Sequence, residues 1–313
     1  MPCYGSAIMD AALRPDTVAS LDSALREDLA AAQSALRTVT PILHHLVGSG
    51  SNALFGDEVV AGVRGMADDL ARQLLATVEA DEAARVEEVR PQLAQALAES
   101  SPLLGHLHAL ALEWQYARRL QARLSLDPVL TPLLQDLIAS PDGVTSALAM
   151  QFLAAQARFC QTQRRMQLPL HELPGDLLQV ALLSFQANVE DFRPAEAKVR
   201  AGWDEARSRL GLAERLVAGM GRDARSALSL SSAGTALFLT ALSLGAGQDR
   251  DLSVLSMAES QIPRLALALR ASGLKQAEVE AQFLALHPDI SLPEGFDRLS
   301  PDEAAAILAT ARD

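Results

Sequence analysis

The chain has 313 residues, a length that corresponds to one to three domains. Apolar residues make up 49% of it and aromatic residues only 4%, and the apolar residues are mainly Ala and Leu. Because Ala and Leu head the helix scale, whereas aromatic and β-branched residues favour strands, the composition predicts an all-α fold. The formal charge of −12 disfavours general binding to nucleic acid, whose phosphates carry the same sign.

Cysteine usage and the first residues bear on the cellular compartment. Cys3 and Cys160 are the only cysteines, too few for a disulfide framework or a four-cysteine zinc site. The N-terminal residues show neither the basic segment nor the apolar run of a signal peptide. We therefore expect a cytoplasmic protein that needs no metal or cofactor.

Apolar residues recur at steps of three and four along Val18–Val39, which predicts a first helix that Pro41 ends or kinks. Val59–Val78 repeats the pattern, and the short segment between them favours an antiparallel hairpin. The alternative is a homodimer formed through the first apolar stripe. A polar helix that begins at Asp81 would complete an N-terminal helical bundle over residues 1–98.

A repeated start signal marks the middle of the chain. Ser101-Pro102 and Ser140-Pro141 lie 39 residues apart, and Ser300-Pro301 is a third copy. Ser as the N-cap and Pro at the first helical position make a physically sound helix start. A period of about 40 residues with two helices per unit resembles HEAT-type repeats. The resemblance implies a HEAT-like helical array over residues 99–313, and such arrays present extended surfaces to other proteins.

The second half of the chain reads as a series of helices. Ser226–Gln248 carries no charge and is long enough to span a bilayer, but it holds many Ser, Thr and Gly residues. We expect a buried helix there and no membrane span. The predicted helices from residue 103 onward cover about 103–124, 128–139, 142–166, 176–190, 194–210, 212–219, 233–244, 252–271 (with a kink at Pro263), 275–286 and 301–311.

Motifs for catalysis and metal binding do not occur in the sequence. It contains no His-Glu-x-x-His pair, no Gly-x-Ser-x-Gly turn and no phosphate-binding glycine loop. Cys160 has no His at helical spacing, and we expect the six histidines to be exposed or half-buried. These observations favour a protein without catalytic activity.

One segment resembles the histidine phosphotransfer motif. His44-His45-Leu46-Val47-Gly48 matches that motif at its His and its Gly, whereas Val47 stands where the family has Lys. The resemblance implies that His44 accepts a phosphoryl group on an exposed helix face. The alternative is a helix end followed by the loop that begins at Gly48.

Residues 101–170 are the only mildly basic stretch, with six Arg against four acidic residues. Arg158 and Arg165 are seven residues apart and so share one helix face. Trp114 and Arg118 lie in an earlier predicted helix. Converging Arg side chains can bind a carboxylate or a phosphate, and we predict that these four residues line a ligand site. The alternative is a solvated surface of Arg–Asp pairs.

Three functions are therefore open from the sequence. The first is a non-catalytic protein-interaction or regulatory scaffold with another protein as its partner. The second is a phosphotransfer or signalling module that uses His44. The third is a sensor that binds an apolar or anionic small molecule between helices.

Overall fold

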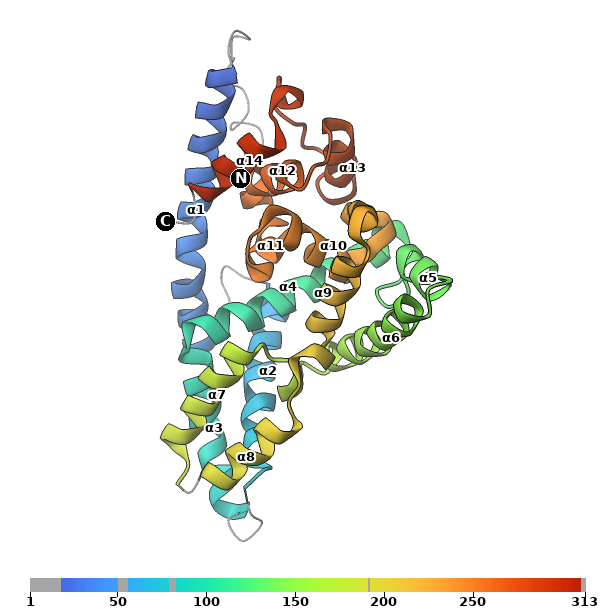
Figure 1. Cartoon of the computed structure of the whole chain (residues 1–313). Coiled ribbons are helices and arrows are strands. Elements are labelled where there is room, and N and C mark those ends of the chain that lie inside the picture. Colours follow the sequence, from blue (N-terminus) through green and yellow to red (C-terminus); the bar gives the residue numbers. More distant parts are fainter. Residues whose placement is uncertain (1–17, 50–55, 79–82, 191, 311–313) are drawn as a thin grey trace. The chain divides into compact units, whose positions relative to one another are not determined.

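We describe residues 18–49, 56–78, 83–190 and 192–310 from a computed structural model (Figure 1). These residues form α-helices, short 3₁₀ helices and turns, and none of them is in a strand. The all-α prediction is confirmed.

The helices follow one another closely along the chain. The α-helices are α1 (Val18–Ser49), α2 (Asp57–Leu75), α3 (Ala83–Glu99), α4 (Ser101–Leu124), α5 (Pro132–Ile138), α6 (Gly143–Arg164), α7 (Gly175–Asn188), α8 (Phe192–Gly202), α9 (Arg209–Gly219), α10 (Leu230–Ala246), α11 (Arg250–Ser256), α12 (Ile262–Ala271), α13 (Gln276–Leu286) and α14 (Pro301–Ala309). The 3₁₀ helices are η2 (Leu170–Glu172), η3 (Glu205–Arg207), η4 (Gly221–Leu228), η5 (Glu259–Gln261) and η6 (Phe296–Arg298).

The chain divides into two compact units. Of the described residues, unit 1 combines 18–36 with 242–310, and unit 2 contains those between 37 and 241. The division predicted near residue 98 separates domains that would fold independently. A compact unit need not fold on its own, so the two observed units do not test this division. That division stays a prediction.

Unit 2 is built around α2. This helix packs against α3 and α4, α7 packs on α3 and α4, and α6 packs on α5 and α9 (Figure 1). The buried face of α2 follows helical spacing through Val59, Val63, Met66, Leu70 and Leu74, each at most 4% exposed. The resulting apolar cluster extends into the adjoining faces of α3, α4 and α7.

Unit 1 contains the first half of α1. The predicted stripe is buried at Leu21, Leu25, Leu29 and Ala32, as its spacing requires. In the segment 259–264, Gln261 Nε2 donates a hydrogen bond to the Ala32 carbonyl at 2.7 Å, and Arg264 donates one to Gln33. The predicted hairpin with α2 is therefore wrong for this half, because its apolar face is buried within unit 1. Farther along α1, Leu43 belongs to the apolar cluster of unit 2.

Several predicted helix boundaries differ from the observed ones. Helix α1 continues through Pro41 to Ser49, so the proline does not end the helix, which was one of its two predicted effects. The predicted helix 194–210 is interrupted: α8 ends at Gly202, η3 follows, and α9 begins at Arg209. The predicted kink at Pro263 is a break, since this proline lies in the first turn of α12.

The uncharged segment forms a largely buried helix. Leu237, Phe238, Leu239 and Leu242 of α10 are each at most 1% exposed, as expected from the sequence. Gly234 has a non-helical conformation with φ of 70°, so the regular part of α10 begins after it. Among the described residues no single helix has the length and composition of a membrane span, whereas η4 and α10 together do, with a bend of 114° between them.

Candidate functional site

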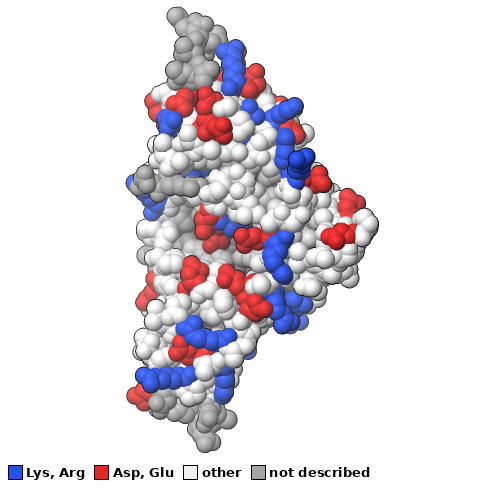
Figure 2. Space-filling view, in the orientation of Figure 1, with Lys and Arg blue, Asp and Glu red and all other residues white. Residues whose placement is uncertain are grey.

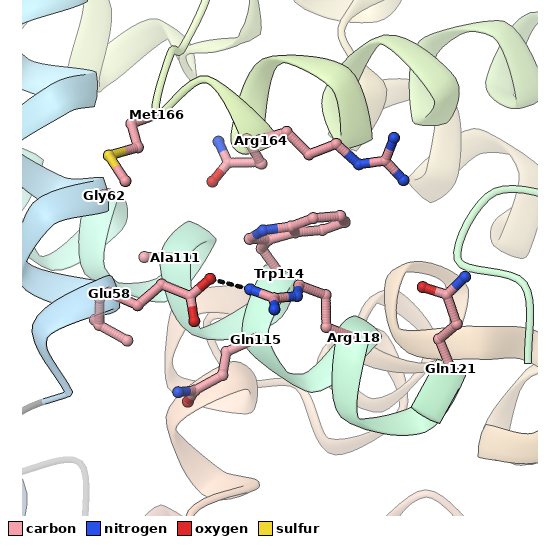
Figure 3. Close-up of a pocket in the computed structure, with 11 residues that line it drawn as sticks. Glu58, Gly62, Ala111, Trp114, Gln115, Arg118, Gln121, Arg164 and Met166 are labelled. Carbon is pink, nitrogen blue, oxygen red and sulfur yellow. Dashed lines mark hydrogen bonds and ion pairs between the residues drawn. The ribbon is translucent and has the colours of Figure 1, made fainter. Parts of the chain in front are cut away.

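A cavity of about 310 Å³ opens within unit 2, between α2, α4 and the end of α6 (Figure 3). Its volume lies at the lower end of the range for small-molecule sites, about 300–1,000 Å³. The lining residues are Glu58, Val59 and Gly62 of α2, Ala111, Trp114, Gln115, Arg118 and Gln121 of α4, and Gln163, Arg164 and Met166 at the end of α6.

Trp114 lies at the centre of the lining, between two arginines (Figure 3). The Arg164 guanidinium lies over the indole ring, with its Cζ atom 6.0 Å from the ring centroid. Arg118 follows Trp114 by one helical turn and forms an ion pair with Glu58. Both members of that pair are about half exposed, at 50% and 53%, so water reaches them. The cavity lining thus combines one aromatic ring with two cationic side chains and one carboxylate.

The loop after α6 is fixed against α2 by hydrogen bonds. Asp69 Oδ2 accepts from the Leu168 amide at 3.2 Å, and Gln73 Nε2 donates to the Leu168 carbonyl at 2.8 Å. Met166 has a φ of 56°, which is uncommon for a residue with a side chain. A Cβ atom at Gly65 would lie 2.5 Å from Met166 Cβ, so glycine is needed for this close approach. The cavity wall at Met166 is therefore held in place by α2.

The structure brings two of the four predicted ligand residues to the cavity. Trp114 and Arg118 line it, whereas Arg158 and Arg165 are exposed and lie outside the lining. Arg164 lines the cavity, and the predicted Arg165 does not. Successive residues of a helix are rotated by about 100° about its axis, so adjacent positions face different directions.

Glu58 and Gln163 also line the cavity and were not predicted from the sequence. Glu58 belongs to the first turn of α2, and acidic residues are common there for reasons unrelated to ligands. Gln163 continues the buried stripe of Phe152, Ala155 and Phe159 along α6 and is 5% exposed. A polar residue on an apolar stripe was the available signal for Gln163.

A buried ion pair joins the helices behind the cavity. Arg209, 1% exposed at the start of α9, binds both carboxylate oxygens of Glu113 on α4, at 2.6 and 3.0 Å. Its Nη1 atom also donates to Gln156 of α6 at 3.3 Å, and its guanidinium lies over the Phe159 ring at 3.7 Å. Glu113 directly precedes Trp114, so this pair fixes the segment of α4 that lines the cavity.

Two further groups complete this buried cluster. Burial opposes ionisation of Glu172, but hydrogen bonds from His171 and from the Arg209 amide (2.7 Å) outweigh it and hold the pKa of Glu172 below its ordinary value. Burial raises the pKa of the Cys160 thiol to about 11. The thiol is therefore protonated at neutral pH and is a poor nucleophile.

The other sequence candidates lie outside this site. The backbone of His44 belongs to α1, but its side chain is not among the described ones, and Cys3 lies outside the described residues. His106 and His108, expected to be exposed or half-buried, are both buried in α4, at 2% and 3%. Within the described part of the chain, no group of three His, Cys, Asp or Glu residues could hold a metal ion.

Surface charge is mixed on the face shown in Figure 2. Among the described residues, Lys and Arg alternate there with Asp and Glu in small groups. A continuous basic track of the kind that follows a nucleic-acid backbone is not seen on this face in the described residues.

Comparison of the chain with protein-family models, with curated proteins and with solved structures gives no match.

Proposed function

We propose that this protein is a non-catalytic regulatory protein that binds a small molecule in the cavity between α2, α4 and α6. The ligand carries an acidic group and an apolar part. The observation that carries the proposal is the placement of Arg118 and Arg164 on either side of the Trp114 ring in one open cavity.

The chemistry of the lining supports an acidic ligand. A guanidinium forms two parallel hydrogen bonds with a carboxylate or a phosphate, and these charge-assisted bonds are stronger than neutral ones. Trp114, Val59 and Met166 offer apolar contact to the rest of the ligand. The buried Arg209–Glu113 pair and the Asp69 and Gln73 hydrogen bonds hold the walls in place before a ligand arrives, which lowers the cost of binding.

Isothermal titration calorimetry with a panel of small apolar carboxylic and phosphoric acids tests this proposal. We expect saturable binding of at least one compound, weakened about tenfold or more in Arg118→Gln because a charge-assisted bidentate contact is lost. Arg119→Gln is the matched control, since Arg119 is exposed on the same helix and lies outside the lining.

The result that contradicts the proposal is the absence of binding to wild-type protein by every acid tested, whether or not the acid also carries an amino group. Equal weakening in Arg118→Gln and Arg119→Gln would also contradict it, because the effect would then come from general surface charge.

The regulatory role is proposed from the sequence. The lack of catalytic motifs and the low cysteine count favour a non-catalytic protein of the cytoplasm that acts on another protein. A HEAT-like array over residues 99–313, and a bundle over 1–98, belong to the same proposal. Helices α5 and α6 pack against each other as the two helices of such a unit would, whereas α12 packs mainly against α14. Limited proteolysis of the full chain would separate it from other divisions: cleavage near residue 98 supports it, and first cleavage near 36 or 241 opposes it.

A further inference from the structure

Glu58 gives the cavity a negative charge beside a positive one. Its carboxylate is about half exposed, pairs with the equally exposed Arg118, and lies on the cavity wall (Figure 3). An anion that binds Arg118 has to compete with Glu58 or lie next to its negative charge. A site built only for an anion gains nothing from a carboxylate at this position.

A ligand with both charges removes this conflict. Its acidic group can form an ion pair with the Arg118 guanidinium, and a neighbouring ammonium can form one with the Glu58 carboxylate. An exposed ion pair contributes little to stability, so exchanging it for two ligand contacts costs the protein little. Arg164, over the Trp114 ring, adds a second cation to the lining, and Gln115 and Gln163 line the same space.

We infer that the ligand is an amino acid with an apolar side chain. This inference rests on the proposed function. In an α-amino acid, the carboxylate and the ammonium are attached to the same carbon, so one end of the molecule carries both charges that Arg118 and Glu58 need. The side chain then lies against Trp114, Val59 and Met166, which form the apolar part of the lining.

Calorimetry on the full chain tests the inference with one compound in three forms. The probes are L-phenylalanine, N-acetyl-L-phenylalanine, which lacks the ammonium, and L-phenylalaninamide, which lacks the carboxylate; L-leucine and L-methionine with their blocked forms extend the panel. We expect at least one free amino acid to bind, and both of its blocked forms to bind about tenfold more weakly or worse.

Variants at Glu58 separate recognition of the ammonium from general effects. Glu58→Gln should weaken binding of the free amino acid and leave binding of the N-acetyl form unchanged or stronger, because Arg118 is then released. Asp57→Asn is the matched control, since Asp57 is the adjacent exposed acidic residue and does not line the cavity. Circular dichroism and a melting curve of each variant show whether it is folded.

The outcomes distinguish this inference from the proposal on which it rests. If an N-acetyl form binds as tightly as the free amino acid, or if only simple acids bind, the cavity takes an acid but the amino-acid inference is wrong. If neither amino acids nor simple acids bind, both are wrong. Loss of amino-acid binding in Asp57→Asn equal to that in Glu58→Gln also overturns the inference.

Discussion

Replacement of Arg209 should destabilise the fold strongly, because this residue forms a buried ion pair. Arg209→Met removes the guanidinium from the buried Glu113 carboxylate, and loss of one member of a buried ion pair costs about 3–5 kcal/mol. Urea denaturation measures the loss. Arg207→Met, at an exposed position two residues earlier, should change the free energy of unfolding by less than about 0.5 kcal/mol. A loss below about 1 kcal/mol for Arg209→Met would show that the pair is not buried as described.

Glu172 should give the fold a pH dependence of known sign. Burial alone would raise its pKa, but hydrogen bonds from His171 and the Arg209 amide lower it below the ordinary value of 4.5. Ionised Glu172 therefore stabilises the fold above the unfolded pKa, and this contribution is lost as pH falls through the folded pKa.

The stability difference between wild type and Glu172→Gln measures this contribution. We expect wild type to be the more stable protein at pH 7, and the difference to shrink as pH falls below about 4.5. Thermal melts of both proteins over this pH range check the expectation. A difference that stays constant, or grows in acid, would contradict the assignment of Glu172 as an ionised hydrogen-bond acceptor.

Individual lining residues could be predicted from the sequence, whereas the charged residues that pair with each other could not. Trp114 and Arg118 were predicted as ligand residues because converging Arg side chains can bind an acid and both residues lie in one predicted helix of the basic stretch 101–170. Glu113 and Arg209 are 96 residues apart, and each looks like an ordinary helical charge in the sequence. Only the packing of α4, α6 and α9 turns them into a buried pair, so no local pattern could reveal it.

Helix α2 and the loop after α6 approach each other at one glycine. Gly65→Ala places a Cβ atom 2.5 Å from Met166 Cβ and 2.7 Å from its carbonyl oxygen, so the loop must move. We expect a loss of about 1–3 kcal/mol and an altered cavity.

Gly105 of α4 is the matched control, because a Cβ atom there meets nothing within 4 Å. Gly105→Ala should be neutral or stabilising by up to about 1 kcal/mol, since alanine is the better helix former. Denaturation of both variants makes the comparison. If the two substitutions have the same effect, α2 does not hold the loop in the way described.

The N-cap of α14 offers a test of how individual helices are stabilised. The Ser300 hydroxyl accepts from the Glu303 amide, and the Glu303 carboxylate accepts from the Ser300 amide, which makes a capping box. Ser300→Ala should cost about 0.5–2 kcal/mol. Ser100→Ala should cost much less, because Ser100 caps α4 without a side-chain hydrogen bond. Equal losses in thermal melts would contradict the assigned caps.

Helix starts also show what local sequence predicts and what it misses. Ser300-Pro301 begins a helix as expected, because the cap is completed by Glu303 within the same turn. At Ser140-Pro141 the same dipeptide precedes the helix, and the Asp142 carboxylate caps α6 by accepting hydrogen bonds from the backbone amides of Val144 and Thr145. At Ser101-Pro102 the cap position is Ser100. The type of element was thus predictable, whereas its first residue depended on which neighbouring side chain capped it.

The helical content of the molecule was predictable from the sequence. Which helices pack against each other was not. Apolar spacing in Leu21–Ala32 showed which face of α1 is buried, because burial alone sets that period. The stripe does not specify which segment packs against it. The short connection between the first two helices led us to predict a hairpin of α1 with α2. The observed partner segment, 259–264, lies more than two hundred residues away in sequence. The cavity likewise needs α2, α4 and α6 together.

Tryptophan fluorescence reports directly on whether the cavity beside Trp114 binds a small acid. The chain has two tryptophans, so Trp203→Phe leaves Trp114 as the only one. Titration of this variant with the acids and amino acids named above should change the Trp114 emission saturably, with the same affinity as in calorimetry. The change should weaken in the Arg118→Gln background and persist in Arg119→Gln. Binding seen by calorimetry with no change in Trp114 emission would place the ligand elsewhere and contradict binding in this cavity.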